Sequence, residues 1–136
     1  MGKSILFINQ SSGYLMIDIV NAHLPHYDNI VLITGFLNPR ETALNNKVKV
    51  IMCKPYDRTS RITRFYSWFL FWLQSLYYVF IVFRKHKLYF VTNPPINAFL
   101  ANFVKRPFAY LVFDIYPEAL SRYSYIKKTS FLFQFR

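Results

Sequence analysis

One stretch of this sequence is long and apolar enough to decide between very different folds. Residues 65–83 are nineteen consecutive residues without a charge, bracketed by Arg64 on one side and by Arg84 and Lys85 on the other. As an α-helix, such a segment extends about 28 Å, close to the ~30 Å thickness of the hydrocarbon core of a bilayer. The segment can therefore cross a membrane, lie on one, or fill the core of a globular domain.

The rest of the chain alternates between two kinds of segment. Short, continuous apolar runs predict strands, and segments with helical spacing of apolar residues lie between them. The predicted strands are 4–9, 30–35, 48–53, 88–92 and 108–114, and the predicted helices are 14–24, about 59–84, and 96–104. This alternation is typical of an α/β fold with a parallel sheet covered on both faces. The right-handed crossover rule gives a Rossmann-like parallel sheet of about five strands in the order 3-2-1-4-5, with flanking helices and one long apolar helix.

The predicted sheet limits what the long helix can do. The first and fourth strands must pair, and they flank the helix in sequence, so a helix that crossed a membrane would prevent the sheet from forming. A helix of 25 residues is about 37 Å long, whereas strands of this size span ~17–20 Å, so one end must extend beyond the sheet. We expect the helix to lie on or dip into one leaflet. Packing against a part of the protein outside this sequence and a true span are the alternatives.

Positive charge is concentrated around the apolar stretch. The net charge is +11, and the region from Lys47 to Lys87 contains nine basic residues and one acidic residue, Asp57. Such a balance indicates an anionic partner: nucleic acid, a phospholipid surface or a phosphorylated ligand. No motif that reads nucleic acid is present, so we expect no nucleic-acid partner.

The overhanging end of the helix combines cations with aromatic rings. Aromatic rings at headgroup depth and cations on anionic lipid together describe an interfacial membrane anchor. The residues predicted to contact the membrane are Arg58, Arg61, Arg64, Trp68 and Trp72.

Three polar loops follow predicted strands, at 10–13, 93–95 and 114–118. In a doubly wound sheet they project from the carboxyl edge, where ligands bind. Gly13 lets the backbone approach a ligand, or is a plain turn glycine. Asp114 is a carboxylate at the expected ligand-binding edge, or a helix cap, and Glu118 suits the first turn of a helix.

A single cysteine and three scattered histidines give no cluster of metal ligands, so we expect no metal and no cofactor.

Three segments, in this order and spacing, resemble one known family: ILFINQSSGYLMIDIV, VTNPPINAFLANF and VFDIYPEAL. They are similar to the amino-terminal domain of family 4 glycosyltransferases of the GT-B fold, most of all to the bacterial branch that builds surface polysaccharides. The resemblance covers residues 4 to about 128. It implies half of a GT-B fold: an incomplete Rossmann-like acceptor domain over 1–128, a tail over 129–136, and no donor domain in this sequence.

The resemblance also implies a function. Such enzymes, of the hexosyltransferase type, transfer a sugar from a nucleotide-sugar donor to an acceptor, often lipid-linked, at the cytoplasmic face of the inner membrane. The implied acceptor-binding residues are Gly13, Tyr14 and Asn93, with Asp114 as candidate base and Glu118 as the second candidate. We expect a peripheral membrane protein that is inactive without the second domain, which binds most of the nucleotide sugar. The alternative is a small non-catalytic membrane-binding protein that uses the basic aromatic helix.

Overall fold

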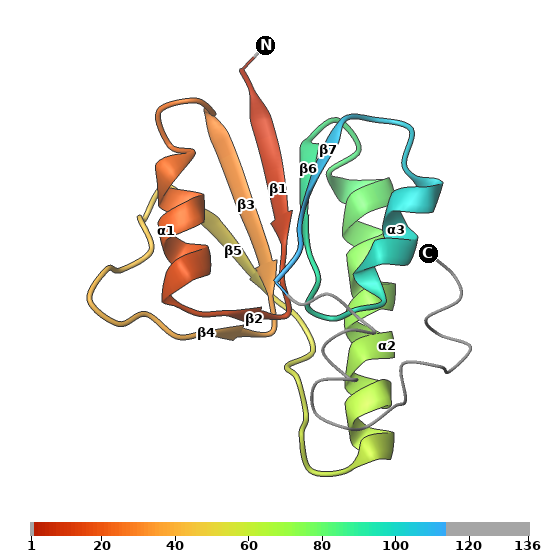
Figure 1. The fold of residues 1–136 in the computed structure, drawn as a ribbon. Helices are drawn as coiled ribbons and strands as arrows, with labels where there is room; N and C mark the ends of the chain where they lie inside the picture. The colour runs from red at the N-terminus through yellow and green to blue at the C-terminus, as the bar shows by residue number, and fades with distance from the viewer. Residues whose placement is uncertain (1, 114–136) are drawn as a thin grey trace, which may run out of the picture.

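A five-stranded parallel sheet forms the centre of the protein (Figure 1), and the computed structural model describes residues 2–113. Its strands are β1 (Ser4–Ile8), β3 (Asn29–Thr34), β5 (Lys49–Met52), β6 (Lys87–Val91) and β7 (Phe108–Leu111). They lie in the order β5-β3-β1-β6-β7, and every pairing is parallel. Numbered along the chain, this is the predicted order 3-2-1-4-5, so the α/β, Rossmann-like prediction is confirmed.

Helices cover both faces of the sheet (Figure 1). The helices are α1 (Tyr14–Ala22), α2 (Arg61–Tyr77), which continues as the π-helical turn η1 (Tyr78–Val82), and α3 (Asn97–Phe103). α1 lies on one face, and α2 and α3 lie on the other. The long apolar helix predicted at about 59–84 is therefore present, and it crosses over between β5 and β6.

Alternation along the strands builds a separate core on each face. In β1, Ile5 and Phe7 pack with residues of α1, such as Met16, whereas Leu6 and Ile8 pack with residues of α2, such as Phe71. Successive side chains of a strand point to opposite faces, and here both faces are covered. This is why the strands read as continuous apolar runs rather than as alternating ones.

The start of α1 differs from a simple reading of its sequence. Serine commonly caps a helix, but Ser11 and Ser12 form the short strand β2, which pairs in parallel with β4 (Phe36–Leu37). Gly13 is the N-cap of α1, and it makes no side-chain capping bond. The two serines thus form a separate two-stranded sheet with β4.

Part of the predicted site lies outside the described residues. Asp114 and Glu118 follow the last described residue, Phe113, and so does the tail 129–136.

The amino-terminal half of α2 extends past the carboxyl ends of the strands, as the helix-length argument predicts (Figure 1).

Candidate functional site

Loops from several strands meet at the carboxyl edge of the sheet. The backbone N–H of Gln10, after β1, donates to the carbonyl oxygen of Asn93, after β6 (3.0 Å), and that of Gly35, after β3, donates to the carbonyl oxygen of Gln10 (2.9 Å). The backbone N–H of Phe113, after β7, donates to Thr92 Oγ1 (3.0 Å). Chain connections leave β1 and β6 toward opposite sides, so this edge is the topological switch point at which open α/β sheets bind ligands.

Gln10 ties these loops to helix α2. Its side chain is fully buried, and its Nε2 donates to the carbonyl oxygens of Lys54 (3.1 Å) and Ser67 (3.0 Å). Gly35 permits this arrangement, because a Cβ there would lie 2.5 Å from the Lys54 carbonyl oxygen.

The sequence placed Gln10 only in a polar loop and did not single out Gly35. The one available signal was an amide side chain directly after a buried strand.

The three predicted acceptor-binding residues lie on the adjoining loops after β1 and β6. A Cβ added to Gly13 would meet nothing within 4 Å, so the space in front of this backbone is open. Tyr14 is half exposed, and the guanidinium carbon of Arg40 lies 4.8 Å from the centroid of its ring. Asn93 is partly buried and accepts the Gln10 bond described above. This edge thus offers an aromatic ring, a nearby cation and open backbone.

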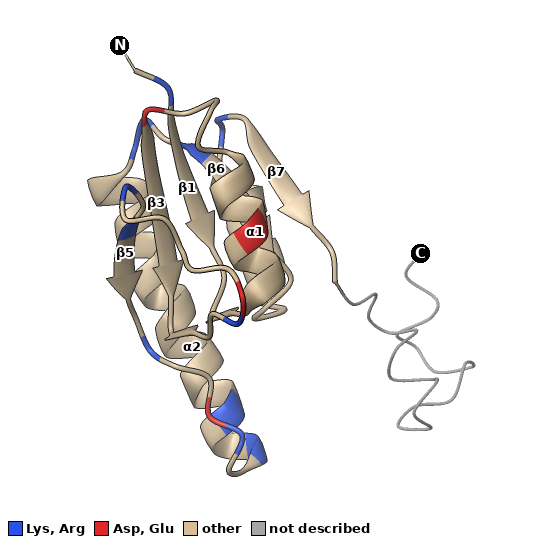
Figure 2. Ribbon diagram, turned by 90° about the vertical axis from the view of Figure 1, so that its left-hand side faces the viewer, with Lys and Arg blue, Asp and Glu red and all other residues tan. Residues whose placement is uncertain are grey.

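The loop before α2 places cations at the tip of the molecule (Figure 2). Ser60 caps the helix in a capping box with Thr63, so the helix begins at Arg61. The hydroxyl and the backbone N–H of Thr59 both donate to Asp57 Oδ1, and these bonds hold the pKa of Asp57 below its usual value. One ionised carboxylate therefore accompanies the cations, and the tip stays positive.

The side of α2 that faces the sheet is partly polar. Ser67, Phe71 and Ser75 are fully buried there. Ser67 Oγ donates to the carbonyl oxygen of Arg64, and Ser75 Oγ donates to that of Phe71, both at 2.8 Å. Both hydroxyls are thereby satisfied within the helix, and their small side chains let the helix lie close to the sheet.

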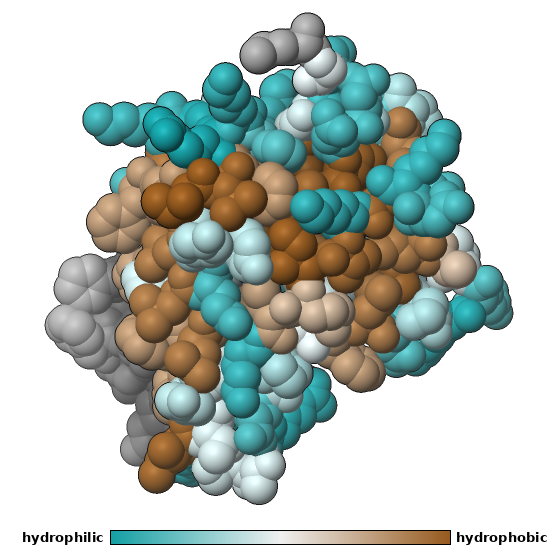
Figure 3. Space-filling model, turned by 180° about the vertical axis from the view of Figure 1, so that it is seen from behind, coloured by the Kyte–Doolittle hydropathy of each residue, from teal (hydrophilic) through white to brown (hydrophobic). Residues whose placement is uncertain are grey.

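The opposite side of α2 is apolar and exposed to solvent. Residues three or four positions apart form one stripe along the helix. We call this the outer stripe; it consists of Ile62, Phe65, Tyr66, Phe69, Leu73, Tyr77 and Phe80. Ile62 is 82% exposed and Phe65 is 64% exposed. Seen from behind, apolar atoms run down the side of the molecule on which α2 lies, beside a band of hydrophilic ones (Figure 3). A surface helix normally exposes a polar face, whereas α2 is apolar both on the side that packs on the sheet and on the exposed side.

None of the five predicted membrane-contacting residues belongs to this stripe. Arg58 and Arg61 are exposed, whereas Arg64, Trp68 and Trp72 are partly buried. The ring of Trp68 stacks on Tyr56 with centroids 5.8 Å apart. Phenylalanines and Tyr66, rather than the tryptophans, supply most of the exposed aromatic surface, which the sequence pattern did not distinguish.

Geometry bears on whether α2 crosses a membrane. By length and composition, one helix among the described residues, Arg61–Val82, is long and apolar enough to do so. In this fold, however, β5 before the helix and β6 after it belong to one sheet, and Phe71 and Val79 pack into its core. A helix held along a sheet in this way can offer one face to a bilayer, but it cannot be surrounded by lipid.

Comparison of the chain with protein-family models, with curated protein sequences and with solved structures finds no match. The features that bear on function are thus those of the molecule itself: the switch-point edge and the outer stripe of the helix that passes beside it.

Proposed function

We propose that this chain is the amino-terminal, acceptor-binding part of a membrane-associated glycosyltransferase. In the complete enzyme, a sugar passes from a nucleotide-sugar donor to a lipid-linked acceptor during synthesis of a cell-surface polysaccharide. The protein lies peripherally on the cytoplasmic face of the inner membrane. The resemblance of three ordered segments to family 4 glycosyltransferases supports the reaction class.

The observation that carries the proposal is the position of the outer stripe. The amino-terminal half of the stripe runs along the part of α2 that extends past the carboxyl ends of the strands, beside the edge where an α/β sheet binds its ligand. Gln10 links that edge to α2 through Ser67. A membrane that covers the stripe would bring a lipid-linked acceptor next to the loops after β1 and β6.

The reaction requires a base beside the acceptor hydroxyl. As the hydroxyl attacks the anomeric carbon of the donor sugar, it loses a proton, which a carboxylate within hydrogen-bond reach can accept. We assign this role to Asp114, which follows directly on Phe113 at the carboxyl edge, with Glu118 as the second candidate. The open backbone at Gly13 leaves room for the acceptor, and Tyr14 and Asn93 flank it.

The test of the base uses this chain fused to the donor domain of a GT-B enzyme. We expect transfer of sugar to a lipid-linked acceptor, and a loss of kcat on the order of 10²–10⁴-fold in Asp114→Asn at unchanged thermal stability. Asp18→Asn, which changes an exposed carboxylate on α1, should retain full activity. If Asp114→Asn retains kcat, Asp114 is a helix cap rather than the base.

The test of the acceptor loop uses Gly13→Ser in the same fusion. Serine is a good N-cap residue and meets no obstacle at this position, so the free energy of unfolding should stay within about 0.5 kcal/mol of wild type. The added side chain occupies the open space, and the KM for the acceptor should rise at least several-fold. An unchanged KM would remove Gly13 from the acceptor site.

The alternative is a small, non-catalytic membrane-binding protein. The outer stripe by itself favours this alternative, because an exposed apolar surface can bind a membrane without any catalytic site. Both proposals predict vesicle binding, and only the first predicts sugar transfer once a donor domain is present. A fusion that binds vesicles but transfers no sugar would favour the alternative.

A further inference from the structure

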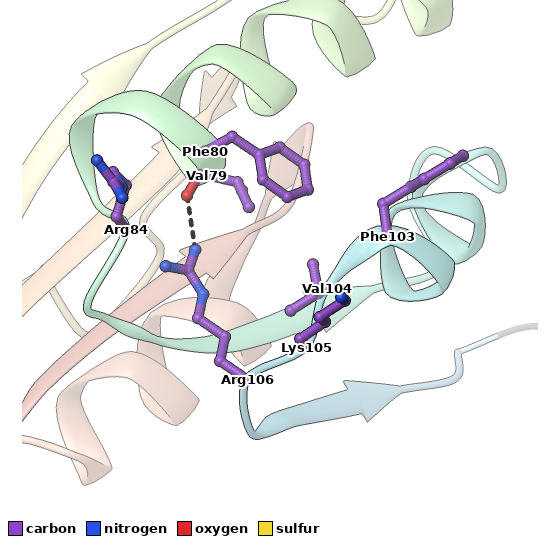
Figure 4. A pocket seen from close by; sticks show the side chains of 7 residues that line it. All are labelled: Val79, Phe80, Arg84, Phe103, Val104, Lys105 and Arg106. Atoms are coloured by element: carbon purple, nitrogen blue, oxygen red, sulfur yellow. Dashed lines mark hydrogen bonds between the residues drawn. The ribbon is translucent and has the colours of Figure 1, made fainter.

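A cavity of about 380 Å³ lies at the far end of α2, between η1 and the end of α3 (Figure 4). Its lining combines three cations, Arg84, Lys105 and Arg106, with apolar walls that include Phe80 and Phe103. No carboxylate belongs to this lining. The cavity is remote from Arg58, Arg61 and Arg64, which lie at the opposite end of the helix.

Arg106 fixes the shape of this cavity. Its guanidinium donates to the carbonyl oxygen of Val79 (2.7 Å; Figure 4) and to that of Phe83 (2.8 Å), two carbonyls at the end of the helix. A cation at a helix carboxyl terminus also offsets the helix dipole. Arg106 is thus committed to the fold. Arg84 and Lys105 are exposed and make no hydrogen bond within residues 2–113, so they remain available to a ligand.

The apolar wall is continuous with the outer stripe. Phe80 belongs both to the stripe and to the cavity, and the neighbouring Ile81 is exposed as well. Phe103, on α3, is 63% exposed on the other side of the cavity. A small hydrophilic anion would pair with the cations but leave these rings in water. A ligand with an anionic head and an apolar body satisfies both parts of the lining.

We propose that this cavity binds the phosphate headgroup of an anionic phospholipid, with Arg84 and Lys105 on the phosphate and the acyl chains against Phe80 and Phe103. The inference rests on the membrane association in the proposed function and extends it to a defined lipid site. Cations then lie at both ends of the helix that carries the outer stripe, and this helix is about 33 Å long over the 22 residues of Arg61–Val82. Held at both ends, α2 lies parallel to the membrane surface, and the carboxyl edge of the sheet opens along the membrane rather than into it.

The experiment titrates the purified chain by calorimetry with three soluble probes. These are a dihexanoyl phosphatidylglycerol below its micelle concentration, the matching phosphatidylcholine, and inorganic phosphate. The double variant Arg84→Ala/Lys105→Ala is compared with Lys3→Ala/Lys47→Ala, which removes the same charge from exposed positions just before β1 and β5. Thermal unfolding of all the proteins establishes that they are equally folded.

We expect phosphatidylglycerol to bind the wild type and the control variant within twofold of each other, and to bind the cavity variant about 30-fold more weakly. Phosphatidylcholine and inorganic phosphate should each bind at least tenfold more weakly than phosphatidylglycerol. Equal loss in both variants would indicate a general charge effect, tight binding of inorganic phosphate would indicate a phosphate site, and no binding to wild type would indicate no site. Each of these results overturns the proposal.

Flotation of the wild type with vesicles that contain phosphatidylglycerol separates this inference from the proposed function. If the wild type floats, and Arg84→Ala/Lys105→Ala changes neither flotation nor calorimetric binding, the lipid site is excluded and the proposal of a peripheral membrane protein remains. If the wild type does not float but binds the short-chain phosphatidylglycerol specifically, the membrane proposal is excluded and the cavity remains a lipid site.

Discussion

The buried amide of Gln10 is the sharpest test of how the carboxyl edge is held to α2. In Gln10→Met, the side-chain volume is nearly kept, but two donated hydrogen bonds are lost, to Lys54 O (3.1 Å) and Ser67 O (3.0 Å). Each such bond contributes about 0.5–1.5 kcal/mol net, and a buried carbonyl left without a donor costs about 1–3 kcal/mol. Ser67 O lies inside α2 and keeps its intrahelical bond. The carbonyl of Lys54, whose bond to Gln10 is partly buried, loses a donor and can incur part of the larger cost.

We therefore expect Gln10→Met to lower the free energy of unfolding by about 2–4 kcal/mol, a large part of the usual total of about 5–15 kcal/mol. Urea unfolding followed by the fluorescence of Trp68 and Trp72 measures it, since both tryptophans lie on α2. The matched control is Gln74→Met. Gln74 is exposed, and its Oε1 accepts a bond from the backbone N–H of the same residue, Lys54 (2.8 Å).

The control should lose less than about 1 kcal/mol, because water replaces an exposed bond. Equal losses in the two variants would refute the reasoning, since burial of the amide would then make no difference. A loss below 1 kcal/mol in Gln10→Met would show that the fold does not depend on this link between the loops and α2.

Three further predictions concern packing, pH and charge. Gly35→Ala places a Cβ 2.5 Å from the carbonyl oxygen of Lys54 and should destabilise the protein by about 1–3 kcal/mol in the same urea assay, whereas Gly13→Ala should cost far less. Burial, with a smaller effect of Arg106, lowers the pKa of His86 below its usual value of 6.5. As the pH falls, the unfolded chain therefore takes up a proton at this histidine at a higher pH than the folded chain does. The free energy of unfolding should then fall as the pH drops below about 6.5. His86→Gln should reduce this pH dependence of the melting temperature and His26→Gln should not; the same pH slope in both variants would exclude His86 as its source. Replacing Arg58, Arg61 and Arg64 by alanine should weaken binding to anionic vesicles, by an amount that shrinks as salt is added, and binding that is unchanged at low salt would assign all of the affinity to the outer stripe.

Much of the architecture followed from the sequence because it depends on short-range patterns. Continuous apolar runs such as SILFI and NIVLIT belong to strands buried on both faces, and the crossover rule then fixes their order. The length of the 65–83 stretch required an overhang, because a helix of that length exceeds any strand of the sheet. The loops after β1 and β6 were likewise predicted to share one edge, since all strands are parallel.

The tertiary structure decided which side of each segment matters. Trp68 and Phe69 are adjacent in sequence and equally apolar in pattern, yet Trp68 stacks beneath Tyr56 while Phe69 lies on the outer stripe. Ser67 and Ser75 are buried against the sheet while Phe65 and Phe69 are exposed, and composition alone does not reveal which side of the helix is covered. The link from Gln10 to Ser67 joins residues 57 positions apart, and the cavity between η1 and α3 is formed by segments whose contact depends on helix packing. Such long-range contacts depend on the shape of the whole fold, whereas strand and helix periodicity is set by neighbours within a few residues.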